Sequence, residues 1–212
     1  MSLRLYLLRH GETTFSQTGG YCGAIDPELT PEGIEMAEAF SEAYRSIPWS
    51  AIYVSPMTRT QMTARPLCEA MGLEMRLRDG LKEIQYGKWE GQTPDFVREN
   101  YEEDYIHWLT EPAWNPPTGG ETAVQIASRA SLVISEIEDA YPSGHVLVVS
   151  HKATIRIILC SLLGIDLGRY RDRIAALAAS VSIVTFGVHG PLLEVLGDRN
   201  YMPAHLRDRP GT

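Results

Sequence analysis

Short apolar runs alternate along this chain with longer segments of helical periodicity. Two of the runs, Leu3–Leu8 and His145–Val149, are dominated by Leu and Val and are short enough to be buried strands. Between such runs lie segments such as Ala123–Ile137, where apolar residues recur at helical spacing after a capping-box signal. Strands that alternate with helices pack as layers around a mostly parallel sheet. The predicted fold class is therefore α/β: a three-layer α/β/α sandwich with a mainly parallel central sheet.

Further strands and helices are expected around these segments. Thr30 is a suitable N-cap and Pro31 fits the first helical turn, so a helix is expected to begin there with Ile34 on its buried face. A second helix is expected over Thr58–Met71, where Pro66 is predicted to kink the helix or end its regular part. Three more strands are expected at residues 51–54, 181–186 and 192–196.

Residues from about 87 to 117 lack this clear periodicity and are rich in Tyr, Trp, Glu and Asp. Only short helical patterns occur there, near residues 96–100 and 103–109. The chain has no internal repeat, low-complexity tract or linker, and its 212 residues are enough for one domain with a sizeable core. We predict a single domain over residues 1–212 that carries a small helical cap inserted at about 87–117.

The overall charge argues against several classes of partner. The formal net charge is −8, whereas proteins that bind nucleic acid or anionic membranes usually present a basic surface. No apolar stretch reaches membrane-spanning length, and no secretory signal is recognisable. Cys22, Cys68 and Cys160 are widely spaced and odd in number, which fits a reducing compartment. These features predict a cytoplasmic protein that binds neither nucleic acid nor a membrane.

Charged side chains gather where the predicted strands end. Arg9 and His10 follow the first strand, His151 follows a second buried strand, and Arg59 lies just after a third. Because the carboxyl ends of parallel strands meet at one edge of a sheet, two imidazoles and at least two guanidiniums are expected close together. Glu83, in the loop after residue 80, adds a carboxyl group to this set.

This set of side chains suits phosphoryl transfer. Two guanidiniums can bind a dianionic phosphoryl group through paired hydrogen bonds. An imidazole among cations is held neutral and is a competent nucleophile, while a second imidazole, if protonated, can stabilise the transferring group. A carboxylic acid can protonate the departing oxygen, and the helix after His151 offers backbone N–H groups to an anion. The cations neutralise the developing charge, so no metal and no cofactor are expected, and no His/Asp cluster has metal-ligand spacing.

Five sequence blocks in order resemble one known family. The chain is similar to the histidine phosphatase superfamily, in the branch that contains cofactor-dependent phosphoglycerate mutases and fructose-2,6-bisphosphatases, and the resemblance runs from about Leu3 to Leu196. A lone Arg-His-Gly is weak evidence, but five blocks in the right order are specific. The blocks are "LLRHGET" at 7–13, "VSPMTRTQMTA" at 54–64, "LKEIQYGKWEG" at 81–91, "PPTGGET" at 116–122 and "VVSHKATIR" at 148–156.

The resemblance implies a role for each matching residue. His10 is expected to be the nucleophile that becomes phosphohistidine. The phosphoryl group is expected to contact Arg9, Arg59 and His151. Glu83 is expected to act first as the general acid and then as the base that activates water.

Three more positions follow from the same resemblance. Gly23 lies where the family offers a backbone N–H to the phosphate. The family commonly has Asn after an aromatic residue that follows the first motif, and here Ser16 follows Phe15, so that phosphate contact is shortened or lost. Lys152 stands where the family often has Gly, and it either adds a cation to the pocket rim or points into solvent.

The chain is shorter than the mutases of this family, which favours hydrolysis over transfer. The predicted activity is a metal-independent phosphatase that hydrolyses small phosphomonoesters through a phosphohistidine intermediate. A cofactor-dependent phosphoglycerate mutase and a non-catalytic phosphate-binding relative remain alternatives. The expected partner is a small phosphorylated metabolite, and a homodimer is left open.

Aromatic residues of the cap and its surroundings are candidates for contacts with the organic part of the substrate. Tyr21, Tyr86 and Trp89 are the foremost of these, together with Tyr105, Trp108 and Trp114. The alternative is that these rings pack against one another and have no contact with the substrate.

Overall fold

The computed structural model describes residues 2–209 and 211. Within these residues one mixed sheet runs through the molecule, with strand order β3-β2-β4-β1-β5-β6. Strands β1 to β4 are mutually parallel, β5 is antiparallel to β1, and β6 is antiparallel to β5. The strands are β1 Leu3–Arg9, β2 Trp49–Val54, β3 Met75–Leu77, β4 Gly144–Ser150, β5 Val181–Gly187 and β6 Gly190–Asp198.

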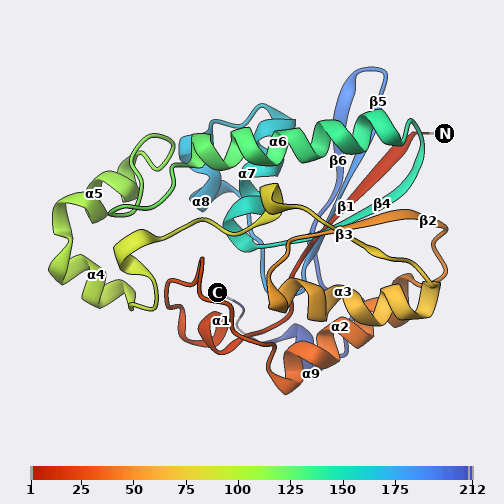
Figure 1. Ribbon diagram of the computed structural model, residues 1–212, viewed down its shortest axis with the longest axis horizontal. Coiled ribbons are helices and arrows are strands. Elements are labelled where there is room, and N and C mark those ends of the chain that lie inside the picture. Colours follow the sequence, from red (N-terminus) through yellow and green to blue (C-terminus); the bar gives the residue numbers. More distant parts are fainter. Residues whose placement is uncertain (1, 210, 212) are drawn as a thin grey trace.

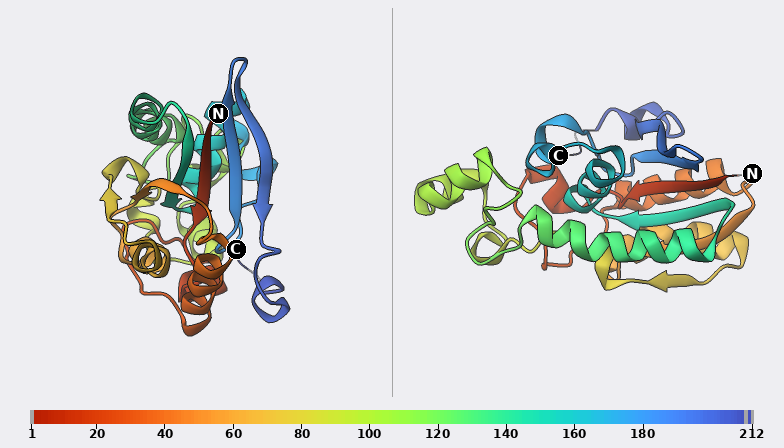
Figure 2. Two further views of the ribbon diagram at one scale, coloured as in Figure 1. Left: turned by 90° about the vertical axis from the view of Figure 1, so that its right-hand side faces the viewer. Right: turned by 90° about the horizontal axis from the view of Figure 1, so that it is seen from above.

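Helices cover both faces of the sheet, with α6 and α7 on one side and α2 and α3 on the other (Figures 1 and 2). The predicted three-layer α/β/α class is therefore confirmed. The α-helices are α1 Thr14–Thr18, α2 Pro31–Tyr44, α3 Thr58–Met71, α4 Pro94–Asn100, α5 Glu102–Thr110, α6 Ala123–Ala140, α7 Lys152–Leu163, α8 Tyr170–Arg173 and α9 Ala204–Arg207. Three short 3-10 turns lie at Asp79–Leu81, Gly87–Trp89 and Leu167–Arg169.

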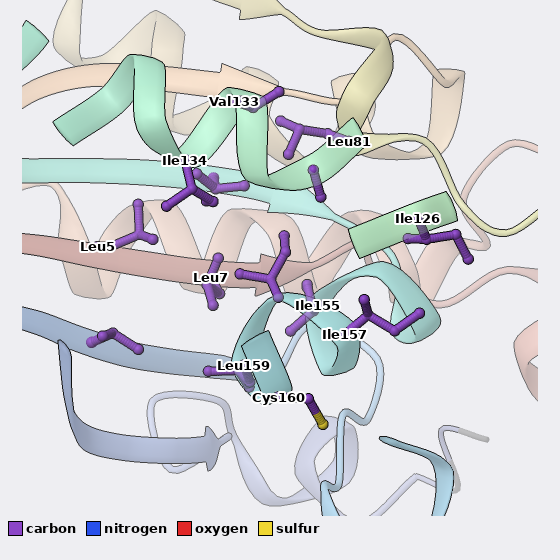
Figure 3. Close-up of a cluster of buried hydrophobic side chains, with 14 of the residues drawn as sticks. Leu5, Leu7, Leu81, Ile126, Val133, Ile134, Ile155, Ile157, Leu159 and Cys160 are labelled. Carbon is purple, nitrogen blue, oxygen red and sulfur yellow. The ribbon is translucent and has the colours of Figure 1, made fainter. Parts of the chain in front are cut away.

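The alternation of side chains along β1 builds two cores. Leu5 and Leu7 point to the face covered by α6 and α7, where Figure 3 shows them among Ile126, Ile134 and Ile155. Tyr6 and Leu8 join the opposite cluster under α2 and α3. Each fully buried Leu contributes about 1.5–3 kcal/mol relative to an exposed one, so the two faces together hold β1 in the centre of the sheet.

One detail of the predicted helices is wrong, and one of the two effects predicted for Pro66 does not occur. Ile34 is 41% exposed, because α2 buries Gly33, Met36 and Ala37 instead. Pro66 does not end α3, which continues to Met71 and stops where Gly72 adopts a φ of +63°. A left-handed residue cannot continue a right-handed helix, and glycine adopts that conformation at least cost.

Helices α4 and α5, hereafter the cap, lie in the stretch where the sequence predicts a helical cap, at the end of the molecule opposite the chain's N-terminal end (Figure 1). The cap lies beyond the carboxyl ends of the parallel strands. A separate aromatic cluster of Tyr21, Trp89 and Trp108, with Val97, packs inside it. The cap therefore stands over the sheet edge where the sequence places the reactive side chains.

Arg209, near the C-terminal end of the described residues, contacts the first motif. Glu12, next to Gly11 and only 1% exposed, accepts hydrogen bonds from Thr30, Gln17 and the Arg209 guanidinium, whose Nε lies 2.8 Å from Oε2. The backbone oxygen of Arg209 in turn accepts a hydrogen bond from Arg199. The C-terminal segment thus supplies the cation that balances a buried carboxylate two residues from His10.

Arg209→Met is expected to lower the free energy of unfolding by about 1–3 kcal/mol, because it leaves the buried Glu12 carboxylate without its cation. Urea unfolding at pH 7 measures this change. The matched control is Arg207→Met, which removes an exposed guanidinium whose one ion pair among the described residues is with Asp208 at 3.7 Å. Equal changes in the two variants would contradict a structural role for the Arg209–Glu12 pair.

The same pair should show a defined pH dependence. Burial raises the pKa of Glu12, but hydrogen bonds from Arg209, Thr30 and Gln17 outweigh burial and leave it below its ordinary value of 4.5. A carboxyl whose folded pKa is depressed contributes stability above its unfolded pKa and loses it as pH falls through the folded pKa. The difference between wild type and Arg209→Met should therefore be complete at pH 7 and shrink below about pH 4.5.

Candidate active site

A cavity of about 380 Å³ opens at the carboxyl ends of the strands, between the sheet and the cap. This is a typical size for a small-molecule site. Its lining residues come from β1, α3, α7, α8, the cap and the loops between them. They are Arg9, His10, Thr13, Phe15, Ser16, Gly19, Gly20, Tyr21, Cys22, Arg59, Glu83, Tyr86, Pro94, Tyr105, Trp108, Lys152, Ala153, Arg156, Tyr170 and Arg171.

His10 stands directly after β1, where its backbone N–H donates to the carbonyl of Ser150 at the end of β4. Its ring Nδ1 lies 2.8 Å from the carbonyl oxygen of Gly11. A carbonyl oxygen only accepts, so Nδ1 carries the proton and Nε2 of the neutral ring carries a lone pair. The ring is thus oriented and held in the tautomer that a nucleophile needs.

Charge and burial keep this ring neutral. Burial, followed by the charges of Arg59 and Arg9, holds the pKa of His10 well below its ordinary range. An unprotonated imidazole can attack phosphorus, whereas an imidazolium cannot. The predicted effect of neighbouring cations on the first histidine is present in the structure.

His151 is the N-cap residue of α7, and its ring centroid lies 5.3 Å from that of His10. Arg59 Nε donates to His151 Nδ1 at 3.2 Å, and His151 Nε2 lies 2.8 Å from the hydroxyl of Ser55. Burial, then the charges of Arg59, His10 and Arg9, lower the pKa of His151 well below its ordinary range. The ring is fully buried, is absent from the cavity lining and is neutral, so the structure gives no support to a protonated second imidazole.

Two guanidiniums flank His10. Arg9 is 4% exposed, its NH1 donates to the carbonyl of Ala176 at 2.8 Å, and its Nε has no partner among the described residues. Burial lowers the pKa of Arg9 to about 10, which still leaves it charged at neutral pH. Arg59 is 1% exposed and donates to the carbonyls of Ile25 and Gly23. Main-chain carbonyls therefore fix both cations beside the cavity, and Arg59 NH1 also pairs with the Asp26 carboxylate at 3.3 Å.

Glu83 also lines the cavity, but the structure gives its carboxyl group an unexpected set of partners. Oε2 accepts the backbone N–H of Ala153, and Oε1 accepts those of Thr154 and Ile84, at 3.0–3.2 Å. The Ala153 and Thr154 N–H groups in the first turn of α7, where the sequence predicted donors for a substrate anion, are therefore occupied by this side chain. The N-terminal end of α7 stabilises and orients the carboxyl group.

Three of the candidate residues, Gly23, Ser16 and Trp89, have other partners in the structure. The Gly23 N–H donates to Glu90 at 3.0 Å, and a Cβ at this position would lie 1.9 Å from the carbonyl oxygen of Ile84, so Gly23 serves close packing. Ser16 lines the cavity, but its hydroxyl donates to the carbonyl of Thr13 in the capping box of α1. Trp89 is fully buried in the aromatic cluster of the cap and does not reach the cavity.

Other candidates do reach the cavity. Tyr21 and Tyr86 line it with ring centroids 4.9 Å apart, and Lys152 lines it rather than extending into solvent. Sequence reasoning missed Arg156 and Arg171, which line it as well. Arg156 could have been found from its spacing. It lies four residues after Lys152, and residues four apart on a helix lie on the same face, so a cavity residue at 152 predicts another at 156.

Neither a metal centre nor a membrane-spanning helix is found within the described residues. No group of three or more His, Cys, Asp and Glu side chains is arranged to hold a metal ion among them. Of the helices in that part of the chain, none combines the length and apolarity needed to cross a lipid bilayer.

The cavity combines a neutral, oriented imidazole with two guanidiniums and a carboxyl group. These are the nucleophile, anion-binding groups and acid that a phosphoryl-transfer enzyme needs. The sequence pattern of the histidine phosphatase superfamily (branch 1) matches residues 5–199. The chain belongs to this superfamily, and the predicted family is confirmed.

Similar proteins agree with this assignment. Phosphoserine phosphatase 1 of Hydrogenobacter thermophilus is 33% identical over 168 residues, which cover 79% of this chain and 80% of that protein. The adenosylcobalamin/alpha-ribazole phosphatase of Salmonella typhimurium is 29% identical over 161 residues, 76% of this chain and 80% of that protein. The solved structure of Bacillus stearothermophilus YhfR superposes with a TM-score of 0.87 at 26% identity, covering 94% of this chain and 98% of that one. These relatives confirm the predicted class of enzyme, a phosphomonoesterase.

Proposed function

We propose that the chain hydrolyses small phosphomonoesters without a metal, through a phosphohistidine at His10. The single observation that carries this proposal is the fixed His10 ring, with Nδ1 donating to Gly11 and Nε2 left with a lone pair beside Arg9 and Arg59. The phosphoserine phosphatase and the adenosylcobalamin/alpha-ribazole phosphatase described above support the same class of substrate here.

In the first half of the proposed reaction, His10 Nε2 attacks phosphorus and the bond from phosphorus to the ester oxygen breaks. The departing oxygen takes a proton from the Glu83 carboxyl group, so the alcohol leaves neutral. Arg9 and Arg59 neutralise charge on the phosphoryl oxygens as the transfer proceeds. His151 does not contact the substrate in this proposal. Its ring accepts the Arg59 Nε–H and so helps to orient that guanidinium.

In the second half, water attacks the phosphorus of phosphohistidine. The Glu83 carboxylate takes a proton from this water, and the bond from nitrogen to phosphorus breaks with its electron pair returning to Nε2. Inorganic phosphate leaves, and His10 and Glu83 are restored to their starting protonation states. The product therefore differs from that of a mutase, which returns the phosphoryl group to an organic acceptor.

The test is phosphate release from p-nitrophenyl phosphate and from a panel of small phosphoesters in the presence of EDTA. We expect release of one phosphate per alcohol formed, at a rate that EDTA does not change. Isomerisation of 3-phosphoglycerate without net phosphate release would instead indicate a mutase. Binding of phosphoesters with no turnover of any of them would indicate a phosphate-binding relative.

Three broader expectations belong with this proposal. A single domain over residues 1–212 is supported by cores that lie on both faces of one sheet. A cytoplasmic location is supported by Cys22, Cys68 and Cys160, which are all free thiols. A homodimer stays a hypothesis that the size of the protein in solution tests directly.

A further inference from the structure

We propose that Lys152, Arg156 and Arg171, hereafter the outer cations, form a second anion subsite in the cavity. The preferred substrate is then a phosphomonoester that carries a further anionic group, a carboxylate or a second phosphate. This inference rests on the proposed function, because it assumes that Arg9 and Arg59 bind the reacting phosphoryl group.

The charges that line the cavity do not balance. Among the described residues it is lined by five cationic side chains, Arg9, Arg59 and the outer cations, against the single carboxyl group of Glu83. Glu83 and one phosphoryl dianion together offset up to three of these positive charges, and Asp26, which does not line the cavity, pairs with Arg59 at 3.3 Å. None of these anions pairs with an outer cation, and cations without a partner in a partly enclosed space are costly unless an anion joins them.

Two of the outer cations share one helix face. Lys152 and Arg156 stand four residues apart on α7, so their side chains project in the same direction. Neither donates a hydrogen bond or forms an ion pair with another described residue, and Arg156 Nε is buried without a partner. Buried donors in native proteins are nearly always paired, so an unpaired one at a cavity wall points to a ligand.

The third outer cation comes from a different element and is held in place. Arg171 on α8 lies with its guanidinium carbon 3.5 Å from the centre of the Trp108 ring on α5. A guanidinium stacked on an aromatic face keeps its N–H groups in the plane of the stack, where they can donate to an anion. The stack joins the body of the protein to the cap and orients this cation before any ligand arrives.

The titration of Lys152 agrees with this geometry. Burial, followed by the charges of Arg9 and Arg156, lowers the pKa of Lys152 to about 8, and the pKa of Arg156 is also lowered, chiefly by burial. An anion bound between these side chains would favour their charged forms and reverse both shifts.

The space between the inner cations, Arg9 and Arg59, and the outer cations suits the carbon chain of a small metabolite. Tyr21, Tyr86, Tyr105 and Trp108 line the cavity beside Arg171, and its volume of about 380 Å³ holds a metabolite rather than a folded protein. The substrate is therefore expected to present one anion to His10 and another to the outer cations, with its carbon chain along the aromatic rings.

Matched substrate pairs test this subsite. The pair 3-phosphoglycerate and glycerol 3-phosphate differs by a carboxylate, and the pair fructose 1,6-bisphosphate and fructose 6-phosphate differs by a phosphate. We expect kcat/KM to be about tenfold or more higher for the doubly anionic member of at least one pair, as expected for a charge-assisted hydrogen bond. Which pair responds identifies the second anion as a carboxylate or a phosphate.

Arg156→Gln and Arg171→Gln should each lower this preference by about tenfold. The matched control is Arg173→Gln, which removes an exposed arginine of α8 that does not line the cavity. Because Arg171→Gln also removes the stack on Trp108, melting temperatures accompany the kinetics. No preference for either doubly anionic substrate, or a preference that both variants retain, overturns the subsite.

Binding separates failure of the subsite from failure of the proposed function. Calorimetry with His10→Ala measures the affinity for both members of each pair without turnover. Hydrolysis of all four esters with equal binding overturns the subsite and leaves the phosphatase intact. Selective binding of the doubly anionic esters by a wild-type protein that hydrolyses none of them supports the subsite and refutes the phosphatase.

A pH profile provides a further readout for Lys152. The charged groups that face it are Arg9 on β1, Arg156 on α7, Arg171 on α8 and Glu83 in the preceding loop. The preference for the doubly anionic ester should be complete below about pH 8 and decline above it, as Lys152 loses its proton. Lys152→Met should remove this decline, and an unchanged profile in that variant would refute the assignment of Lys152.

Discussion

His10→Ala is expected to lower kcat/KM for every phosphomonoester by at least about ten-thousandfold, the scale on which removal of a covalent nucleophile acts. His10 Nδ1 donates its proton to the carbonyl of Gly11, which leaves the lone pair on Nε2 to attack phosphorus. Alanine has no such lone pair, so the variant loses the nucleophile. His151 cannot replace it, because both of its ring nitrogens are engaged by Arg59 and Ser55.

The intermediate gives this prediction a second readout. Rapid mixing with substrate followed by an alkaline quench should trap phosphate on wild-type protein, and ³¹P NMR should show a bond to nitrogen. The matched control is His189→Ala, which removes an exposed histidine in the turn between β5 and β6. Turnover that survives in His10→Ala, or phosphate trapped on that variant, would refute the assignment of the nucleophile.

Much of the fold was predictable because it follows from local periodicity. The alternation along β1 and β4 and the helical spacing of Ala123–Ile137 reflect burial on defined faces, which a single sequence records directly. The three-residue strand β3 was missed, since a pattern so short has no detectable period. Ile34 was placed on the wrong face because hydrophobicity alone does not decide which of two adjacent positions packs inward.

The catalytic end of the cavity was predictable for a topological reason. Residues that follow parallel strands meet at one edge of the sheet, so His10 and His151 had to converge once their strands were recognised. Arg9 and Arg59 followed from the same argument. Their hydrogen bonds to main-chain carbonyls depend on loops whose conformation no local pattern specifies.

The substrate end of the cavity was harder to predict. Gly23 was offered as a phosphate donor, but Glu90 binds its N–H, and that contact joins residues 67 positions apart. Arg171 belongs to a four-residue helix with no useful periodicity, and its position depends on Trp108 from the cap. Specificity in this protein therefore depends on long-range contacts, whereas the placement of its reactive groups depends on strand order.

Glu83→Gln is the second large effect, and its size should depend on the leaving group. An alkyl phosphate releases a strongly basic alkoxide that needs a proton, so its hydrolysis should slow by about 10²- to 10⁴-fold. p-Nitrophenyl phosphate releases a weakly basic phenolate, and the attack of His10 on this ester should slow by less than about tenfold. Single-turnover kinetics measure this first step apart from the attack of water, which the variant should also slow.

The contacts of Glu83 predict a further cost that must be separated from the chemical one. Its two carboxyl oxygens both accept backbone N–H groups, and the amide nitrogen of Gln would face one of these donors with another donor. We expect a loss of about 1–3 kcal/mol in the free energy of unfolding, visible by urea titration. Glu136→Gln, which changes a carboxylate of α6 that pairs with Arg78 outside the cavity, controls for loss of charge. Equal slowing of alkyl and aryl esters in the Glu83 variant would show that this carboxyl group only holds the start of α7 in place.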